Sequence, residues 1–146
     1  MDQPRIDIWQ LQVQLSQRLL RWSGFSIGAG VAMVLIGKPF WRGAGSQFAG
    51  WGLVDAAIGL FGMRTARAKA SDPATHQPDE QRNAQRNLRR VLWINTALDV
   101  GYVTGGATLV YTKGRKNLFW RGSGWGIVIQ GGFLLLFDLL HALRLR

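Results

Sequence analysis

The sequence predicts an all-α integral membrane protein, a four-helix bundle made of two tandem parallel helical-hairpin repeats. Three stretches, 43–63, 91–112 and 122–143, contain no lysine or arginine and one aspartate each, and a fourth, 22–37, has no charged residue. A helix needs about 20 mostly apolar residues to cross the hydrocarbon layer of a bilayer, so these lengths favour four membrane spans. The whole chain, 1–146, is expected to form a single transmembrane domain.

A soluble four-helix bundle is the alternative interpretation. Mean hydropathy is +0.02, which is low for a membrane protein, but the polar residues are concentrated at the N-terminus and in the segment 64–90. The helices of a soluble bundle need a polar face that recurs every 3.6 residues. The segment 127–140 is apolar nearly all round and lacks such a face, which favours the membrane interpretation.

The first helix is expected over about 5–37. Apolar residues recur at helical spacing from Ile8 to Leu19, before the uncharged stretch, and Pro4 suits a first helical turn. Arg21 would extend its side chain to the lipid headgroups. The polar N-terminus is too long for a secretory signal peptide, and no small-residue cleavage site follows the first apolar stretch, so no cleaved signal is expected.

The second helix is expected over about 44–65, the third over about 79–113 and the fourth over about 121–144. A run with two prolines, 71–78, separates the second helix from the third. Two acidic residues open the third helix and arginines follow them, which matches the direction of a helix dipole.

Two halves of the chain, 5–70 and 79–146, resemble each other. The motif FWRGAG at 40–45 recurs as FWRGSG 79 residues later, and a glycine-rich segment at 24–30 recurs in similar form 77 residues later. Each half contains two spans, so both copies have the same orientation, which implies a pseudo-two-fold axis along the membrane normal.

Small residues at four-residue spacing allow helix backbones to approach closely in lipid. Such pairs occur on the first and third predicted helices and are equivalent in the two halves, so we expect these two helices to be central in the bundle. The second helix also carries small residues on one face. The glycines concerned are Gly24, Gly28, Gly101, Gly105, Gly52 and Gly59.

The charge distribution predicts the orientation in the membrane. Four spans place both termini and the central loop on one side, and that side holds twelve of the 18 lysines and arginines. The positive-inside rule then makes both termini cytoplasmic, in the inner membrane of a bacterium, with the lipid bilayer as the immediate surroundings. The net charge of +10 is explained by these boundary residues, and no nucleic-acid-binding motif accompanies it, so no nucleic acid is expected as a partner.

Three aspartates fall within the predicted spans. A carboxylate at the bilayer centre costs ~2.5–3.5 kcal/mol on insertion scales, and such residues usually face a bundle interior. Two of them lie eight residues from the cytoplasmic end of their span, so both sit roughly 12 Å above it. Polar residues on nearby helical faces complete the expected ligand-binding set: Asp55, Asp99, Asp138, Asn95, Gln130, Tyr102 and His141.

These carboxyl groups have two further explanations: they hold helices together, or they pair with a basic group of a partner protein. No catalytic triad, zinc-protease motif or phosphate-binding glycine loop is present, so no catalytic residue and no cofactor is assigned. The pair Asp138 and His141 supplies too few ligands to predict a metal site. The chain has no cysteine, which excludes disulfides and thiol catalysis.

Three motifs, WGxxD at 51–55, LDVGY at 98–102 and QGxFLLxFDxxH at 130–141, resemble an uncharacterised bacterial family of small four-span membrane proteins, known only as a domain of unknown function. The resemblance covers most of the chain from about residue 20. It implies that these polar positions form the signature of the family, and it implies no activity.

The expected function is binding or transport of a small cation, proton or polar metabolite at the intramembrane carboxylate cluster. The alternative is a structural or assembly subunit of a larger membrane protein complex. An enzyme is disfavoured because no catalytic set is recognisable. Four short helices enclose little volume, so a homo-oligomer or a larger complex is expected.

Overall fold

The computed structural model describes residues 7–145, and in that range the chain contains helices and no strand. The predicted all-α class is therefore confirmed. At about 1.5 Å per residue the four long helices extend for roughly 40 to 50 Å, which exceeds the ~30 Å of a hydrocarbon layer. The elements are α1 (Ile8–Leu35), α2 (Pro39–Ala70), η1 (Pro73–His76), α3 (Pro78–Tyr111), η2 (Lys113–Arg115) and α4 (Leu118–Arg144).

Capping side chains and prolines determine where the helices begin. Asp7 accepts hydrogen bonds from two backbone N–H groups in the first turn of α1, and Asn117 does the same for α4. Pro39 and Pro78 occupy the first positions of α2 and α3, where a missing N–H leaves no hydrogen bond unmade. Pro4, predicted for the first turn of α1, lies outside the described residues.

The helices α2 and α4 begin three to five residues before their predicted starts, at Pro39 and Leu118. The repeated FWRG motif thus lies in the first turn of each helix. The prediction took each helix to begin where the uncharged stretch begins. In the structure Arg42 and Arg121 already lie in the first helical turn, because Pro39 starts α2 and the Asn117 cap starts α4. The same reasoning ended α2 too early, since the helix continues through a basic segment to Ala70.

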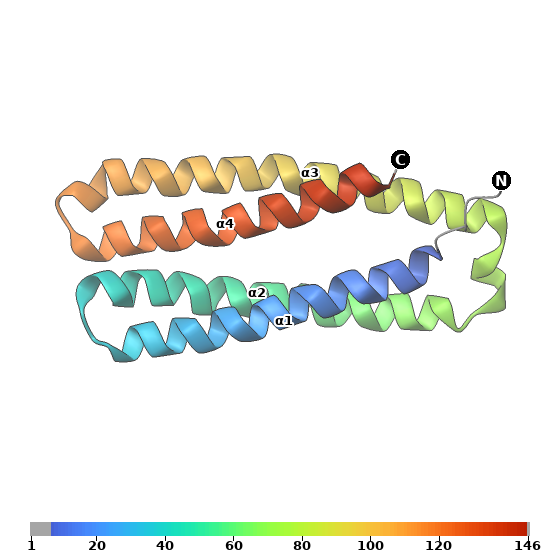
Figure 1. Cartoon of the computed structure of the whole chain (residues 1–146), viewed down its shortest axis with the longest axis horizontal. Helices are drawn as coiled ribbons and strands as arrows, with labels where there is room; N and C mark the ends of the chain where they lie inside the picture. The colour runs from blue at the N-terminus through green and yellow to red at the C-terminus, as the bar shows by residue number, and fades with distance from the viewer. Residues whose placement is uncertain (1–6, 146) are drawn as a thin grey trace.

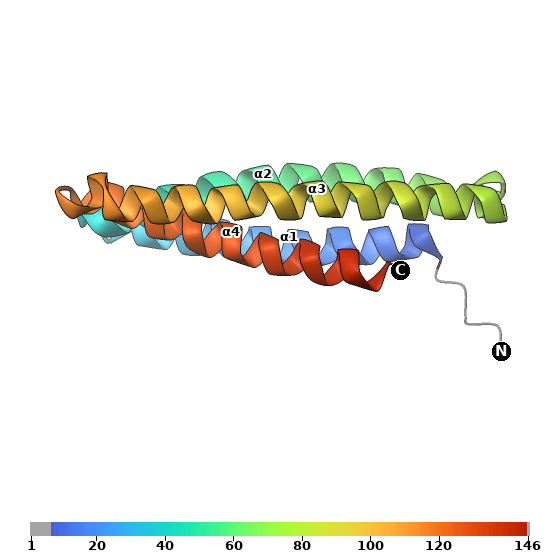
Figure 2. The same cartoon turned by 90° about the horizontal axis from the view of Figure 1, so that it is seen from above.

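Two antiparallel hairpins, α1–α2 and α3–α4, lie side by side (Figure 1). Both hairpin turns lie at one end of the elongated molecule, which we term the turn end (36–38 and 112–117). The start of α1, the α2–α3 connection and the end of α4 lie at the other, the terminal end, as Figure 2 also shows. The main contact between the hairpins is made by α2 and α4, and α1 barely touches α3.

Glycines allow α2 and α4 to approach each other closely. A Cβ atom on Gly43 would overlap the backbone carbonyl of Phe119, and a Cβ on Gly122 would overlap the carbonyl of Phe40. The two contacts are equivalent: in each, a glycine of one helix meets the first-turn phenylalanine of the other. A side chain larger than hydrogen at either position would force the two backbones apart.

The predicted central position of the first and third helices is wrong, because α2 and α4 form the centre. Residue spacing identifies a helical face but not the neighbour that it meets, and these two glycine faces point away from other helices. On α2, by contrast, Gly52 and Gly59 pack as predicted, against Ile27 and Leu20 of α1. Among the described residues, no atom outside the local helix would lie within 4 Å of a Cβ on the four glycines expected to pack, Gly24, Gly28, Gly101 and Gly105.

The middle of the bundle has a polar interior and an apolar exterior. Large apolar side chains point outward along all four helices; Leu35 and Phe61, for example, are 80% and 76% exposed. The side chains buried between the helices are largely small or polar. The buried polar residues of the bundle are Ser16, Ser23, Ser26, Asp55, Thr96, Asp99, Ser123, Gln130, Asp138 and His141.

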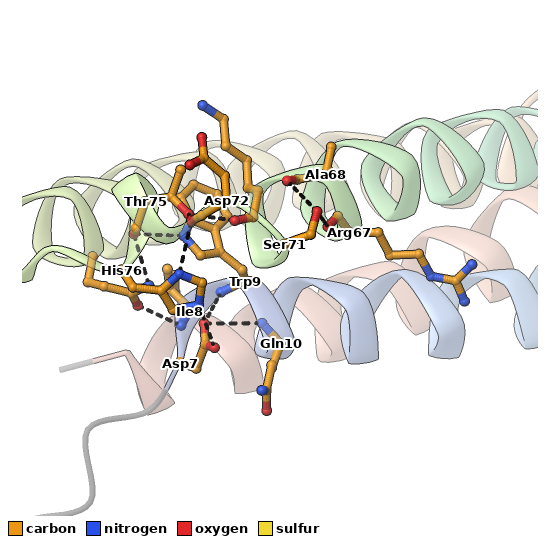
Figure 3. Close-up of polar contacts among 12 residues, drawn as sticks. Asp7, Ile8, Trp9, Gln10, Arg67, Ala68, Ser71, Asp72, Thr75 and His76 are labelled. Carbon is orange, nitrogen blue, oxygen red and sulfur yellow. Dashed lines mark hydrogen bonds and ion pairs between the residues drawn. The ribbon is translucent and has the colours of Figure 1, made fainter.

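The terminal end has the opposite distribution, with an apolar cluster inside. The indole N–H of Trp9 donates a hydrogen bond to the carbonyl of Thr75 over 3.1 Å, and Asp7 lies 3.6 Å from His76 (Figure 3). These contacts anchor the start of α1 to the α2–α3 connection. The buried cluster beneath them consists of Ile8, Trp9, Ala84, Leu92, Ala142 and Leu145.

Within residues 7–145, α4 alone combines the length and the composition typical of a membrane-spanning helix. Its most apolar 18-residue window has a mean hydropathy of 1.8, and 33% of that window is buried. The criterion rests on length and composition only, so four membrane spans stay a prediction.

Candidate functional site

A cavity of about 230 Å³ lies between α2, α3 and α4, with Leu19 contributed by α1. We term it the aspartate cavity. A water molecule occupies about 30 Å³ in the liquid, so the space suits several waters or one small organic molecule. The lining residues are Leu19, Trp51, Val54, Asp55, Ile58, Asn95, Leu98, Asp99, Tyr102, Leu134, Phe137 and Asp138.

All three aspartates predicted to converge do line this cavity. Asp55, Asp99 and Asp138 are 2%, 4% and 7% exposed, and none of the lining residues is a lysine or an arginine. One carboxyl oxygen of Asp55 and one of Asp99 are buried without any hydrogen-bond partner. Unpaired buried polar atoms are rare in folded proteins, because each loses its hydration without compensation.

Asp138 connects the acidic group to α3. Its carboxyl group lies next to the side chains of Asn95 and Asp99, and it interacts electrostatically with Asp55 as well. The amide of Asn95 carries both donors and an acceptor, so it supplies the neutral polar group of the cavity. Three carboxyl groups from three helices thus face one small space.

Aromatic rings from α2 and α3 form one wall. The ring centroids of Trp51 and Tyr102 lie 4.8 Å apart at an interplanar angle of 68°, an edge-to-face contact. Tyr102, which was among the predicted site residues, is 40% exposed, so it lies at the boundary of the cavity.

Helical spacing explains why these side chains meet. Trp51 precedes Asp55 by four residues on α2, and Asn95 precedes Asp99 by four residues on α3. Residues three or four apart share a helical face, so each aspartate brings a neighbour one turn away into the cavity. Tyr102, three residues after Asp99, lies on that face too.

Gln130, which belongs to the predicted ligand-binding set, makes its hydrogen bonds outside this cavity. Its amide oxygen accepts a hydrogen bond of 3.0 Å from the indole N–H of Trp22, and its amide nitrogen donates one of 3.0 Å to the hydroxyl of Ser26. Both partners belong to α1, and Gln130 does not line the aspartate cavity. It is a hydrogen-bonded link between the hairpins.

His141 likewise lies outside the aspartate cavity. Its Nδ1 donates a 2.6 Å hydrogen bond to the carbonyl of Phe137, and its Nε2 lies 3.2 Å from Nη1 of Arg18 on α1. Three residues along a helix correspond to a rotation of about 60° from Asp138, because each residue turns by 100°. That rotation is enough to move a side chain of α4 away from α3 and towards α1.

Sequence reasoning missed the apolar wall of the cavity. The available signal was the helical turn before each aspartate: Trp51 and Leu134 precede Asp55 and Asp138 by four residues, as Asn95 precedes Asp99. The remaining wall residues come from packing between helices and have no signature in the sequence. They are Leu19, Val54, Ile58, Leu98 and Phe137.

The chemistry of the cavity is that of an acceptor-rich space next to aromatic rings. Carboxylates attract cations, and ring faces attract them further. Within the part of the chain that the structure describes, no group of three histidine, cysteine, aspartate or glutamate residues is arranged to hold a metal ion. The carboxyl groups and the neighbouring rings together suit a small cation.

A family model described as a family of unknown function (DUF6992) matches residues 18–139. This match confirms the expected likeness to a family of unknown function, whereas a bacterial origin and four membrane spans stay predictions. Comparisons with curated proteins and with solved structures find no match.

Proposed function

The chain belongs to the DUF6992 family of unknown function, and we propose that it is an integral membrane protein that binds a small organic cation in the aspartate cavity. One observation carries the proposal. Two buried carboxyl oxygens, on Asp55 and Asp99, lack a partner in a cavity that no basic residue lines.

The burial pattern supports a bilayer as the solvent of the middle of the bundle. Soluble monomers rarely expose continuous apolar patches larger than a few hundred Å². Here Phe25, Leu53, Phe61 and Leu136 are all more than half exposed, while serines and aspartates are buried. That distribution is favourable in hydrocarbon and unfavourable in water.

The modest hydropathy of α1, α2 and α3 is compatible with this placement. An average over a helix combines its two faces, and the inner faces of these helices carry glycine, serine, threonine and aspartate. Such residues are typical of helix contacts in membranes. The faces that would meet lipid are the apolar ones.

Two parallel hairpin repeats are supported by the reciprocal glycine contacts. Adding 79 to the pair Gly43 and Phe40 gives Gly122 and Phe119, and each glycine meets the phenylalanine of the other pair. A pseudo-two-fold axis between α2 and α4 relates such contacts. The axis runs along the helices, as the sequence repeat predicts.

The charge distribution supports a location in the bacterial inner membrane with the terminal end in the cytoplasm. Of the 16 lysines and arginines within residues 7–145, ten lie at the terminal end and in its adjoining segments. Basic residues concentrate on the cytoplasmic side of membrane proteins. The apolar cluster at the terminal end is the packing expected of a part in water.

An organic ammonium ion fits the aspartate cavity better than the other members of the predicted ligand class. Its charge would compensate the carboxyl groups, and its methyl or methylene groups would contact Trp51 and Tyr102. A cation over an aromatic face gains ~0.5–2 kcal/mol.

Access to the cavity is open between α2 and α3. Val54 and Leu98 line the cavity and are 47% and 54% exposed, and the two helices make no close backbone contact. Lateral access favours a ligand with an apolar part.

The test compares choline with its neutral isostere 3,3-dimethylbutanol, using tryptophan fluorescence of the full chain in lipid nanodiscs. Choline is expected to change the total tryptophan emission, because Trp51 lines the cavity, and the neutral compound is not. Asp55→Asn and Asp99→Asn are each expected to weaken choline binding at least about tenfold, since each removes a charge from a desolvated site. Asp79→Asn is the matched control, because Asp79 is exposed and remote from the cavity.

Three results would contradict the proposal. Equal binding of choline and its isostere would exclude charge recognition. Folded aspartate variants that bind choline as well as the parent chain would exclude these carboxyl groups. The solubilised parent chain could also take up protons and bind no choline. If the asparagine variants then lose that proton uptake, the cavity is a proton site instead.

A structural or assembly subunit is the second candidate function. The open glycine faces of α1 and α3 favour it, because no other residue within 7–145 covers Gly24, Gly28, Gly101 or Gly105. A second copy or another membrane protein would fit there, and the aspartates would then serve helix pairing. In that case both asparagine variants lose folding, and the parent chain purifies with other subunits or as an oligomer.

A further inference from the structure

A second hollow lies between α1 and α4, and Phe137 is the one lining residue that it shares with the aspartate cavity. It has a volume of about 580 Å³, and we term it the α1–α4 groove. Its lining combines basic and aromatic side chains and includes no acidic residue: Arg18, Arg21, Trp22, Phe25, Phe133, Phe137 and His141.

Aromatic rings form a continuous row along the groove. The rings of Trp22 and Phe133 stack with centroids 3.7 Å apart and an interplanar angle of 10°. Phe133, Phe137 and His141 follow one another at four-residue spacing on α4, with centroid distances of 5.9 Å and 4.5 Å. The polar atom of Trp22 is engaged by Gln130, so the indole offers the groove its apolar face. The row runs over two helical turns of α4 and offers mostly apolar ring surface, which suits an acyl chain.

Two arginines lie at the end of the row that is nearer the terminal end. Within residues 7–145, neither Arg18 nor Arg21 forms an ion pair with a carboxylate, and both are exposed. His141 donates from Nδ1 to a carbonyl, so its Nε2 is free to accept a hydrogen bond from Arg18. That contact orients one guanidinium and uses one of its five N–H donors.

We propose that the α1–α4 groove binds an anionic phospholipid of the cytoplasmic leaflet. The headgroup phosphate engages Arg18 and Arg21, and one acyl chain lies along the aromatic row. Guanidinium groups recognise phosphate through paired hydrogen bonds and charge, and the absence of any acid from the lining leaves that charge uncompensated. The inference rests on the membrane placement of the proposed function and is independent of the cation site.

The experiment titrates the full chain, purified in mild detergent, with phosphatidylglycerol or phosphatidylcholine of identical acyl chains, and counts bound lipids by native mass spectrometry. Phosphatidylglycerol is expected to bind more tightly. Arg18→Gln and Arg21→Gln are each expected to weaken it about fivefold, which corresponds to ~1 kcal/mol per basic residue. Both variants are expected to weaken phosphatidylcholine less, because its choline group already compensates the phosphate charge. The matched control is Arg64→Gln, which removes the same charge from α2 outside the groove.

A purely structural role of Arg18 is separated by Arg18→Lys, which keeps the charge and is expected to retain most of the preference. If Arg18→Gln does not fold, Arg21→Gln decides alone. Equal affinities for the two lipids, or a loss in Arg64→Gln as large as in the groove variants, would overturn the proposal while leaving the membrane placement intact. Loss of the preference in excess inorganic phosphate would identify a soluble-anion site and overturn it too. A chain that is monomeric without detergent and binds neither lipid would overturn both.

Discussion

The buried polar residues of the bundle fall into two groups that differ in their hydrogen bonding. Gln130 meets Trp22 and Ser26, and both polar ends of its amide are used. Asp55 and Asp99 each retain an unpaired oxygen. A residue of the first kind stabilises the contact between hairpins, whereas a residue of the second kind lowers stability unless something binds to it.

Gln130→Leu is expected to lower the free energy of unfolding by about 1–2 kcal/mol, because the indole N–H of Trp22 would lose its buried acceptor. Thermal unfolding in detergent, followed by circular dichroism, measures the change. Gln17→Leu on the exposed face of α1 serves as the control and is expected to have little effect. An unchanged melting temperature in Gln130→Leu would show that the two hairpins are held together by other contacts.

The convergence of the three aspartates could be predicted from the sequence. The depth of each aspartate in its span and the cost of exposing its carboxylate to lipid both follow from the position of that one residue. The placement of Gln130 and His141 could not be predicted. Each differs from Asp138 by about 60–80° around the helix, and only the positions of α1 and α3 decide which neighbour such a side chain meets.

At the scale of the helix, small residues have different meanings according to the neighbour that they face. Among the described glycines, Gly43 and Gly122 leave the least room for a Cβ atom, at the contact between α2 and α4. Gly28 and Gly105 have the spacing of a packing motif but open surroundings. The sequence predicted four helices because their lengths and breakers are local properties. It could not predict the central pair, because that depends on the crossing of helices remote in the chain.

Gly43→Ala and Gly28→Ala therefore make a matched pair. The added methyl group of the first would overlap the carbonyl of Phe119, and the cost of overpacking is about 1–3 kcal/mol. The second meets open space and is expected to leave stability unchanged or to raise it by up to ~1 kcal/mol, since alanine favours helix. Unfolding of both variants in the same detergent gives the comparison. Equal destabilisation would indicate that Gly28 lies in an interface between copies.

Over the whole molecule, the burial pattern reverses along the long axis. The terminal end buries Ile8, Trp9 and Leu92, as a protein in water does, and the middle buries serine, glutamine and aspartate. The mean hydropathy of the whole sequence cannot detect this reversal, because it averages the terminal end and the middle of the bundle together. In the proposed membrane placement, this contrast would put the bilayer boundary near the ends of the predicted spans.

The absence of cysteine allows that boundary to be tested directly with single substitutions. Gln77→Cys in the α2–α3 connection and Lys116→Cys before α4 both place an exposed thiol, at opposite ends of the molecule. In intact bacterial cells that express either variant, a membrane-impermeant maleimide is expected to label Lys116→Cys at once and Gln77→Cys only after lysis, because basic residues retain the terminal end in the cytoplasm. The reverse pattern would invert the orientation but keep the spans. If neither thiol is labelled before lysis and both are labelled after it, in a soluble fraction, the polar interior must be explained without lipid.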